Sequence, residues 1–290
     1  MITGGVGGLG GCLAEIFALR GVGVGVLDVA VGIGGGGGEG EKGGVRDGEE
    51  REGVRYFRCD VGNATQVEEV WQRVVDELGT PTVLINNAAV VNARPFLQQT
   101  MEEVEATLRI NTLSHFQLSR LFIRGLLSRR AGGTIVTVSS VLAHLGAAQL
   151  SAYTASKAAL LAYHASLTAE LAAVAPQIKT VLVATGQLDT QLFGDVKLRG
   201  WWRRFFGPVV GAGEVAVRIV ALLDAGLGGE VKVPTYAAWI AWMGVLPLGV
   251  KRVVRGWSGV DEQFGQLIKP ELSMDKEEDD SSDDSSSDEG

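Results

Sequence analysis

Cysteine and histidine are scarce in this chain of 290 residues, which contains two cysteines and three histidines. Cys12 and Cys59 are too few for a disulfide framework and indicate a reducing compartment. The histidines are scattered, and together with the cysteines they show no spacing typical of a metal site. We therefore expect neither structural disulfides nor a bound metal.

An excess of charge is also missing from most of the chain. The net charge is -8, but residues 275–290 alone hold nine acidic residues and one lysine, which leaves 25 basic and 25 acidic residues elsewhere. A neutral body has no basic footprint, so we expect no nucleic-acid partner. The acidic, serine-rich end has little to bury. We expect a single domain over residues 1–270 and a disordered acidic tail over residues 271–290.

Short β-branched runs alternate with longer helical patterns between these ends. The strand candidates are VGVGVLDV, TVLINNA, GTIVTVSS, KTVLVAT and EVKVP, and the helix candidates span 8–20, 64–78, 101–127, 152–173 and 213–224. Continuous apolar strands that alternate with helices are typical of a parallel sheet covered on both faces. The pattern predicts an α/β fold with a doubly wound, Rossmann-like sheet.

The first ten residues, MITGGVGGLG, have the spacing T-G-x-x-x-G-x-G. Glycines at these positions allow the backbone to turn sharply and to approach a pyrophosphate, which the following helix would bind with its free N–H groups. The same spacing can arise by chance in a segment so rich in glycine. Asp28 ends the next apolar run, where a carboxylate binds a ribose hydroxyl and repels a 2′-phosphate. Residues 29–33 contain no basic residue, so we expect NAD rather than NADP.

A candidate catalytic group lies in the segment SAYTASKAAL. Tyr153 and Lys157 are four residues apart and would share one face of a helix. Chance predicts about 0.1 such pairs in a chain of this composition, so the pair alone is only suggestive. Ser140 ends an apolar strand, and strand ends are where doubly wound sheets bind ligands. His144 follows Ser140 by four residues, but no G-x-S-x-G elbow supports a hydrolase.

The order of these motifs resembles the short-chain dehydrogenase/reductase family. The matching positions are T-G-x-x-x-G-x-G at 3–10, Asp28, Asp60 in CDV, NNAA at 86–89, Asn111, Ser140, Tyr153 and Lys157. The resemblance covers about residues 1–265. It implies an NAD(P)-dependent alcohol dehydrogenase or ketoreductase, in which a hydride moves between an alcohol carbon and nicotinamide.

The resemblance also implies a role for each residue. Tyr153 would be the general acid/base, with its pKa lowered by Lys157; Ser140 would bind the substrate oxygen, and Asn111 would hold a water that links Lys157 to solvent. The implied cofactor-binding residues are Gly4, Gly8, Leu9, Gly10, Asp28, Asp60, Val61, Asn87, Ala88, Ala89, Tyr153, Lys157, Gly186, Leu188 and Thr190. Two departures are Ala89 in place of glycine and Thr185-Gly186 in place of Pro-Gly.

The substrate region leaves alternatives open. In the segment RGWWRRFFGP, two tryptophans and two phenylalanines flank Arg203 and Arg204. They would line a pocket for a long apolar substrate, lie at a membrane interface, or form a packed lid. Residues 233–250 carry no charge, but two prolines interrupt them, so we interpret them as a re-entrant or surface-lying segment rather than a span. A weaker resemblance to the retinol, steroid and fatty-alcohol subgroup implies association with endoplasmic reticulum or lipid droplets; the alternative is a cytoplasmic protein.

Only Met1 and Ile2 precede the glycine loop, so the first strand is expected to be truncated. We interpret the chain as an incomplete gene model or a truncated isoform. Two functions remain. The first is an NAD-dependent oxidoreductase for a small hydrophobic substrate, with family members suggesting a homo-oligomer. The second is a catalytically impaired nucleotide-binding protein at a membrane surface.

Overall fold

The structure is a computed structural model of the chain. The structure describes residues 1–32, 45–186, 188–189 and 210–234, and eight positions between 240 and 253. Most of the glycine-rich stretch 32–44, Thr190, the aromatic segment around Arg203 and Arg204, and the acidic tail lie outside the described residues. The predicted domain end at residue 270 also lies there and stays a prediction.

Eight strands form one sheet. They are β1 (Ile2–Thr3), β2 (Val24–Asp28), β3 (Glu50–Arg51), β4 (Val54–Arg58), β5 (Val83–Asn86), β6 (Gly133–Ser140), β7 (Ile178–Thr185) and β8 (Gly229–Val233). Their order is β3-β4-β2-β1-β5-β6-β7-β8, and all neighbouring pairs except β3–β4 are parallel. The predicted doubly wound sheet is confirmed, with the short antiparallel β3 added at its edge.

β1 lies in the middle of this sheet although it contains two residues. Ile2 pairs with Val26 of β2 on one side and with Ile85 of β5 on the other. Ile2 is 1% exposed, so the strand is part of the core. Its carboxyl end delivers the glycine loop to the edge of the sheet where β2 and β5 also end.

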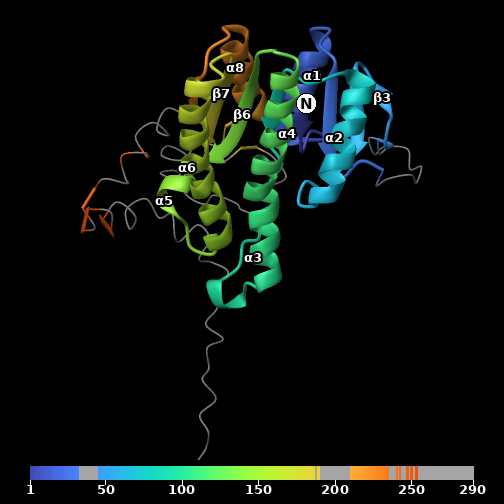
Figure 1. The fold of residues 1–290 in the computed structure, drawn as a ribbon. Coiled ribbons are helices and arrows are strands. Elements are labelled where there is room, and N and C mark those ends of the chain that lie inside the picture. Colours follow the sequence, from blue (N-terminus) through green and yellow to red (C-terminus); the bar gives the residue numbers. More distant parts are fainter. Residues whose placement is uncertain are drawn as a thin grey trace, which may run out of the picture.

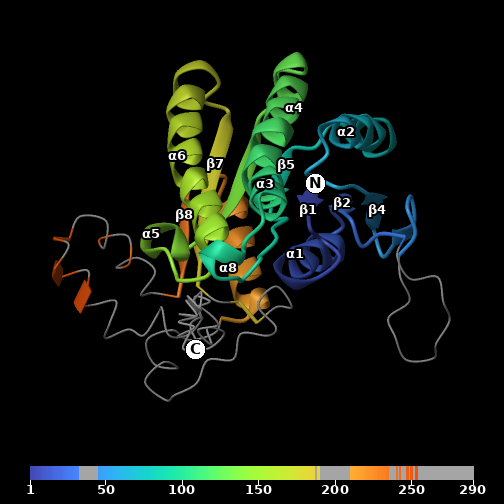
Figure 2. The ribbon, with the colours of Figure 1, turned by 90° about the horizontal axis from the view of Figure 1, so that it is seen from below.

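Helices cover both faces of the sheet, as Figures 1 and 2 show. α1 (Gly8–Leu19) and α8 (Ala212–Asp224) lie on one face, and α2 (Ala64–Leu78), α4 (Ser114–Ser128) and α6 (Ser151–Val174) lie on the other. Each face has its own apolar core; Leu13 and Ile219 pack in the first, and Trp71 and Phe122 pack in the second. The predicted helices at 8–20, 64–78, 152–173 and 213–224 agree with these bounds to within one residue at each end.

The predicted helix 101–127 is divided. α3 (Met101–Leu108) begins with a capping box between Thr100 and Glu103. A π-helical turn, η2 (Arg109–Leu113), then joins α3 to α4. π-Helical turns hold one extra residue and are frequent at functional sites, and this one contains Asn111.

Candidate active site

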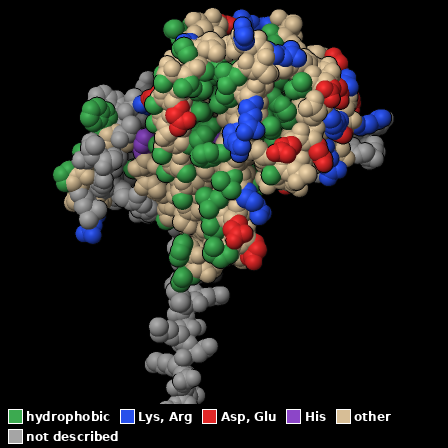
Figure 3. Space-filling model, in the orientation of Figure 1, with side chains coloured by type: hydrophobic (Ala, Val, Ile, Leu, Met, Phe, Trp, Pro, Cys, Tyr) green, Lys and Arg blue, Asp and Glu red, His purple; other side chains and the backbone are tan. Residues whose placement is uncertain are grey.

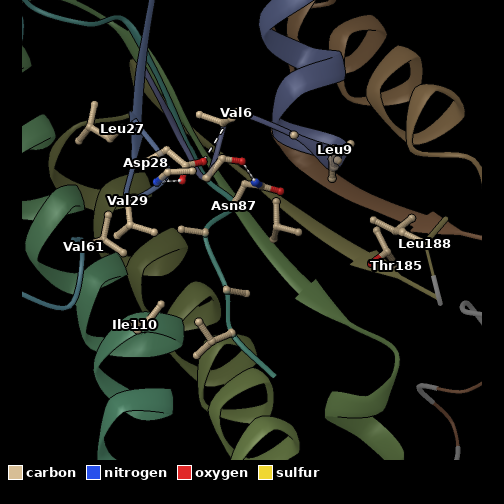
Figure 4. Close-up of a pocket in the computed structure, with 18 of the residues that line it drawn as sticks. Val6, Leu9, Leu27, Asp28, Val29, Val61, Asn87, Ile110, Thr185 and Leu188 are labelled. Atoms are coloured by element: carbon tan, nitrogen blue, oxygen red, sulfur yellow. Dashed lines mark hydrogen bonds between the residues drawn. The ribbon is translucent and has the colours of Figure 1, made fainter. Parts of the chain in front are cut away.

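A cleft of about 870 Å³ lies at the carboxyl ends of the parallel strands. Asp28 lies on one side of it and Thr185 on the other, with Asn87 between them (Figure 4). Its lining includes the predicted residues Gly4, Gly8, Leu9, Asp28, Asp60, Val61, Asn87, Ala88, Ala89, Tyr153, Lys157, Gly186 and Leu188. The fold thus brings residues that are up to 184 positions apart in the sequence to one cavity.

The glycine loop fits closely against its neighbours. Gly4 has a φ of 64°, and a Cβ there would lie 2.9 Å from the Cα of Ala88. A Cβ on Gly10 would lie 2.2 Å from the carbonyl oxygen of Gly4. The N-cap of α1, Gly7, makes no side-chain capping bond to the first turn, so these N–H groups can meet an anion. The loop therefore packs closely against its neighbours and leaves the N–H groups of the first turn of α1 without a side-chain cap.

Asp28 ends β2 and is held in place by the backbone. Its Oδ2 accepts a hydrogen bond from the N–H of Val6 at 3.0 Å, and its Oδ1 accepts one from Ala30 at 3.0 Å. These bonds fix the carboxylate beside the glycine loop. It is positioned to accept further hydrogen bonds from a diol in the cleft.

Thr3 has a structural role that the sequence analysis missed. Its Oγ1 accepts hydrogen bonds from the N–H groups of Asn87 and Ala88, both at 3.0 Å. The side chain of Asn87 donates in return to the carbonyl oxygens of Thr3 and Gly4, at 3.0 and 2.9 Å. The threonine of the motif T-G-x-x-x-G-x-G was the signal for this link between the loops after β1 and β5.

Asp60 and Val61 follow β4 at the same end of the cleft. Oδ1 of Asp60 accepts a hydrogen bond from the N–H of Gly62, and the backbone N–H of Asp60 donates to Gln66, both at 2.8 Å.

Cys59 is buried, and burial raises the pKa of its thiol to about 12. This thiol remains protonated near neutral pH, so it has no nucleophilic role there.

Ser140, Tyr153 and Lys157 meet at the other end. Ser140 ends β6, and its side chain forms a hydrogen bond with Tyr153, which opposes only part of the larger rise that burial causes in the pKa of the phenol. The Nζ of Lys157 lies 5.9 Å from the centroid of the Tyr153 ring and donates to the carbonyl oxygen of Val138 at 2.9 Å. All three side chains are buried, at 5%, 4% and 2% exposure. Ser139, another residue missed in the sequence, donates from Oγ to the carbonyl oxygen of Lys157 at 3.0 Å.

Burial dominates the protonation of this group. It raises the pKa of the Tyr153 hydroxyl to about 12, which is opposite to the lowering expected from Lys157. Burial also lowers the pKa of the Lys157 ammonium to about 8. The reason is that water stabilises both charged forms better than the apolar surroundings do. Near neutral pH the phenol is protonated, and the lysine is close to its titration range.

Asn111 is fully buried in η2, and its side chain is bound to the protein on all sides. Its Oδ1 accepts from the N–H of Val90 at 2.8 Å, and its Nδ2 donates to the Val90 carbonyl at 3.0 Å and to Ser156 Oγ at 3.1 Å. The carboxamide therefore positions the loop after β5 against α6. Val90 and Ile110, which were not predicted, line the cleft through this arrangement.

The segment after β7 closes the cleft at its far side. Gly186 N–H donates to the carbonyl oxygen of Val233 at 2.8 Å, and Leu188 forms an isolated bridge with Val210. Leu188 and Asp189 both line the cleft, and Asp189 was not predicted. The predicted cofactor-binding residue Thr190 lies outside the described residues.

The side chains and helices that the structure describes bear on metal binding and on membrane crossing. In that part of the chain, no group of three or more His, Cys, Asp and Glu side chains could hold a metal ion. Of the helices that the structure describes, none combines the length and apolar character needed to cross a membrane.

His115 and His164 are buried, and burial lowers the pKa of both imidazoles, so they are neutral at pH 7.

A family model described as short chain dehydrogenase matches residues 1–199. The chain belongs to the short-chain dehydrogenase family. This short-chain dehydrogenase is therefore an NAD(P)-dependent oxidoreductase by family, and the sequence-based assignment is confirmed.

Proteins with related sequences share about a quarter to a third of their residues with this short-chain dehydrogenase over the matched regions. The uncharacterized oxidoreductase YDL114W of Saccharomyces cerevisiae is 24% identical over 73% of this chain and 69% of the yeast protein. Retinol dehydrogenase 10 of Homo sapiens is 36% identical over 53% of this chain and 45% of that protein. The match thus spans under half the length of the human protein.

Solved structures share the fold of this short-chain dehydrogenase. A 4-hydroxyisoleucine dehydrogenase complexed with NADH superimposes with a TM-score of 0.66 over 80% of this chain and 95% of that one. The two sequences are 19% identical, so the likeness concerns the fold.

Proposed function

We propose that this chain is an NAD-dependent dehydrogenase that interconverts a hydrophobic alcohol of the retinoid, steroid or fatty-alcohol class and its carbonyl compound. One observation carries the proposal. A single cleft holds Asp28 beside a glycine loop at one end and Tyr153 with Lys157 at the other. A dinucleotide that reacts with an alcohol needs this arrangement, in which one end of the cleft binds the nucleotide and the other end holds the groups that react.

The residues of the first end fit NAD. The α1 N–H groups and the glycine loop would hold the pyrophosphate, and Asp28 would accept hydrogen bonds from the adenosine ribose diol. The carboxylate of Asp28 would repel a 2′-phosphate, which supports NAD over NADP. When bound, the nicotinamide would accept or supply the hydride.

Tyr153 would exchange a proton with the substrate oxygen. With a pKa raised to about 12, its phenol is protonated at pH 7, which suits donation to a carbonyl in the reducing direction. Ser140 would hold the same oxygen through its hydroxyl. The ammonium of Lys157 would stabilise the phenolate that remains after donation.

The surroundings of Tyr153 support an apolar substrate. Ala147, Leu150 and Tyr153 form a buried cluster, and Val91, Ala93 and Leu142 pack against it half-buried. Apolar side chains that pack next to the reacting phenol favour an alcohol with a hydrocarbon body. The likeness to retinol dehydrogenase 10 points to the same substrate class.

The test is turnover of purified protein with NAD and a panel of long-chain alcohols, followed at the NADH absorbance. We expect Tyr153→Phe to lower kcat about a thousandfold while NADH binding is retained. Tyr163→Phe is the matched control, because Tyr163 is a tyrosine on the same helix whose hydroxyl donates to Ser119 at 2.7 Å instead of reaching the cleft. Turnover that survives in Tyr153→Phe would refute the mechanism.

Membrane contact is a further part of the proposal, and the sequence supports it. The aromatic segment with Arg203 and Arg204 has the composition of an interfacial anchor. Flotation with anionic vesicles should recover the protein, and a double change to Glu at these two arginines should leave it in the unbound fraction. Equal recovery of both proteins would count against a membrane role of this segment.

Self-association through α4 and α6 is supported by an apolar surface. Figure 3 shows hydrophobic side chains over α4 and α3, and Leu113 and Phe116 are 58% and 46% exposed. A second copy would cover them. Light scattering should give a dimer or tetramer, and Phe116→Glu should yield monomers. A monomeric unmodified chain would remove this part of the proposal.

A further inference from the structure

Gln149 combines two unfavourable features. Its backbone has a φ of 64°, a conformation that residues other than glycine rarely adopt. Its side chain is buried, with the residue 6% exposed. Among the described residues, Glu52 and Arg130 also have positive φ without being glycine, but both are exposed. Strain and burial therefore coincide at Gln149.

The carboxamide of Gln149 is also unsatisfied. Neither Nε2 nor Oε1 has a hydrogen-bond partner in the part of the chain that the structure describes, and both atoms are shielded from solvent. A buried amide without partners is costly, because it loses its bonds to water without replacing them. Gln99, in a neighbouring loop, shows the usual situation: its Nε2 donates to the Arg94 carbonyl at 2.8 Å, and its Oε1 accepts from Ser151 at 3.0 Å.

The position of Gln149 links it to the reacting group. It lies in the connection between α5 (Leu142–Leu145) and α6, in the segment bounded by Ser140 and Tyr153. Its carbonyl oxygen accepts from the N–H of Arg94 at 3.0 Å, so the loop after β5 holds its backbone. The next residue, Leu150, packs in the same cluster as Tyr153. The backbone carbonyl is thus anchored beside Tyr153, whereas the carboxamide has no partner in the described part of the chain.

Costs of this kind persist where a ligand offsets them, because strained and unsatisfied groups gather at binding sites. We propose that the carboxamide of Gln149 binds a second oxygen of the substrate, separate from the oxygen that reacts at Tyr153. This inference rests on the proposed dehydrogenase function and narrows its substrate. The preferred substrate is an apolar alcohol with one further hydroxyl or carbonyl group, as in a diol or a hydroxyketone.

The chemistry of an amide suits this role. A carboxamide both donates and accepts, so it binds a hydroxyl or a carbonyl oxygen without requiring a charge. A site built to bind a polar group discriminates against analogues that lack it, since its own polar atoms are then left unpaired. The apolar cluster that contains Leu150 and Tyr153 would contact the hydrocarbon part, and the carboxamide would set selectivity.

The experiment compares kcat/KM for a medium-chain alkanol with that for diols of equal length, in which the second hydroxyl moves along the chain. We expect the unmodified protein to prefer at least one diol by about tenfold or more. Gln149→Leu keeps the volume and removes the amide, so it should bring this ratio close to one. It should also raise the unfolding midpoint, because it removes an unsatisfied buried group.

Gln99→Leu is the matched control. It removes a satisfied amide, so it should lower the unfolding midpoint and leave the diol preference unchanged. Gln149→Gly repeats the test without backbone strain, in case Gln149→Leu does not fold. The proposal is overturned if no diol is preferred, or if the preference survives in both Gln149 variants. Failure of the unmodified protein to oxidise any alcohol with NAD would instead refute the dehydrogenase function itself.

Discussion

The carboxamide of Asn111 binds both the N–H and the C=O of Val90, at 2.8 and 3.0 Å. Val90 lies in a loop that lines the cleft. The Asn111 side chain makes the two backbone hydrogen bonds with it that a neighbouring strand would make in a sheet. The π-helical turn η2 places Asn111 for this bond, and Ser156 of α6 accepts from its remaining amide hydrogen at 3.1 Å. Asn111 thereby ties the cleft to the helix that carries Tyr153.

We expect Asn111→Leu to lower the free energy of unfolding by about 2–3 kcal/mol, because it leaves two partly buried backbone groups of Val90 unsatisfied. Urea unfolding followed by circular dichroism measures the change. Asn92→Ala is the control: its single side-chain bond, to Thr107, is long at 3.4 Å, and its loss should cost less than about 1 kcal/mol. Equal stability of the two variants would contradict the role of Asn111.

Lys157 should lower the stability of the protein at neutral pH. Burial lowers its pKa from 10.5 to about 8, so below pH 8 the folded state holds a charge that the unfolded state solvates better. The cost is about 3 kcal/mol there, and it disappears as pH rises from 8 to 10.5, because in this range the lysine is protonated only in the unfolded state, and that protonation becomes less favourable as pH rises. Lys157→Met should therefore be more stable than the unmodified protein by about 2 kcal/mol at pH 7, after loss of the bond to Val138.

The measurement is a pair of denaturant titrations, at pH 7 and pH 10. The advantage of Lys157→Met should shrink toward zero or reverse at the higher pH. Tyr153 is present in both proteins, so its own titration cancels in the difference. An advantage that stays constant between the two pH values would mean that Lys157 is not destabilised by burial.

Most of the fold followed from apolar patterns. β2, β6 and β7 are mostly buried strands with continuous apolar runs, which predict a sheet covered on both faces. The exposed strand β3 was missed, because two charged residues at an edge carry no such pattern. The π-helical turn was missed as well, since one extra residue hardly disturbs the helical period over 101–127.

The site was predicted less evenly. Spacing and family likeness pointed to Asp28, Ser140, Tyr153 and Lys157, and the fold brings them to one cleft or its edge. Burial could not be read from the sequence, and it reverses the expected pKa change of Tyr153. Gln149 carried no signal, because glycine is the residue that usually marks positive φ.

Asp28 and Arg58 should together determine whether NAD or NADP binds. The sequence did not indicate Arg58. Arg58 of β4 is the register partner of Asp28, and its Nη1 lies 3.9 Å from the position of a Cβ on Gly32. We expect Asp28→Ser to weaken NAD binding about tenfold, because it removes the acceptor for the ribose diol, and to strengthen NADP binding by a similar factor. Calorimetric titration with both dinucleotides measures each change.

The control is the double variant Asp28→Ser with Arg58→Gln. If Arg58 receives the 2′-phosphate, the gain in NADP affinity disappears in the double variant while NAD binding matches that of Asp28→Ser. A gain that survives the second substitution would assign the phosphate to another group.

Two adjacent glycines of α1 provide a sharp test of the glycine loop. Gly10→Ala should lower the free energy of unfolding by about 3 kcal/mol or prevent folding, because the new Cβ would lie 2.2 Å from the Gly4 carbonyl oxygen, which is backbone and has little freedom to move. Gly11→Ala places its Cβ at ordinary contact distances of 3.6 to 3.7 Å and should stabilise the helix by about 0.5–1 kcal/mol. Thermal unfolding with and without NAD measures both effects. If the two variants behave alike, the close contact of the loop with α1 is wrong, and with it the geometry proposed for the pyrophosphate.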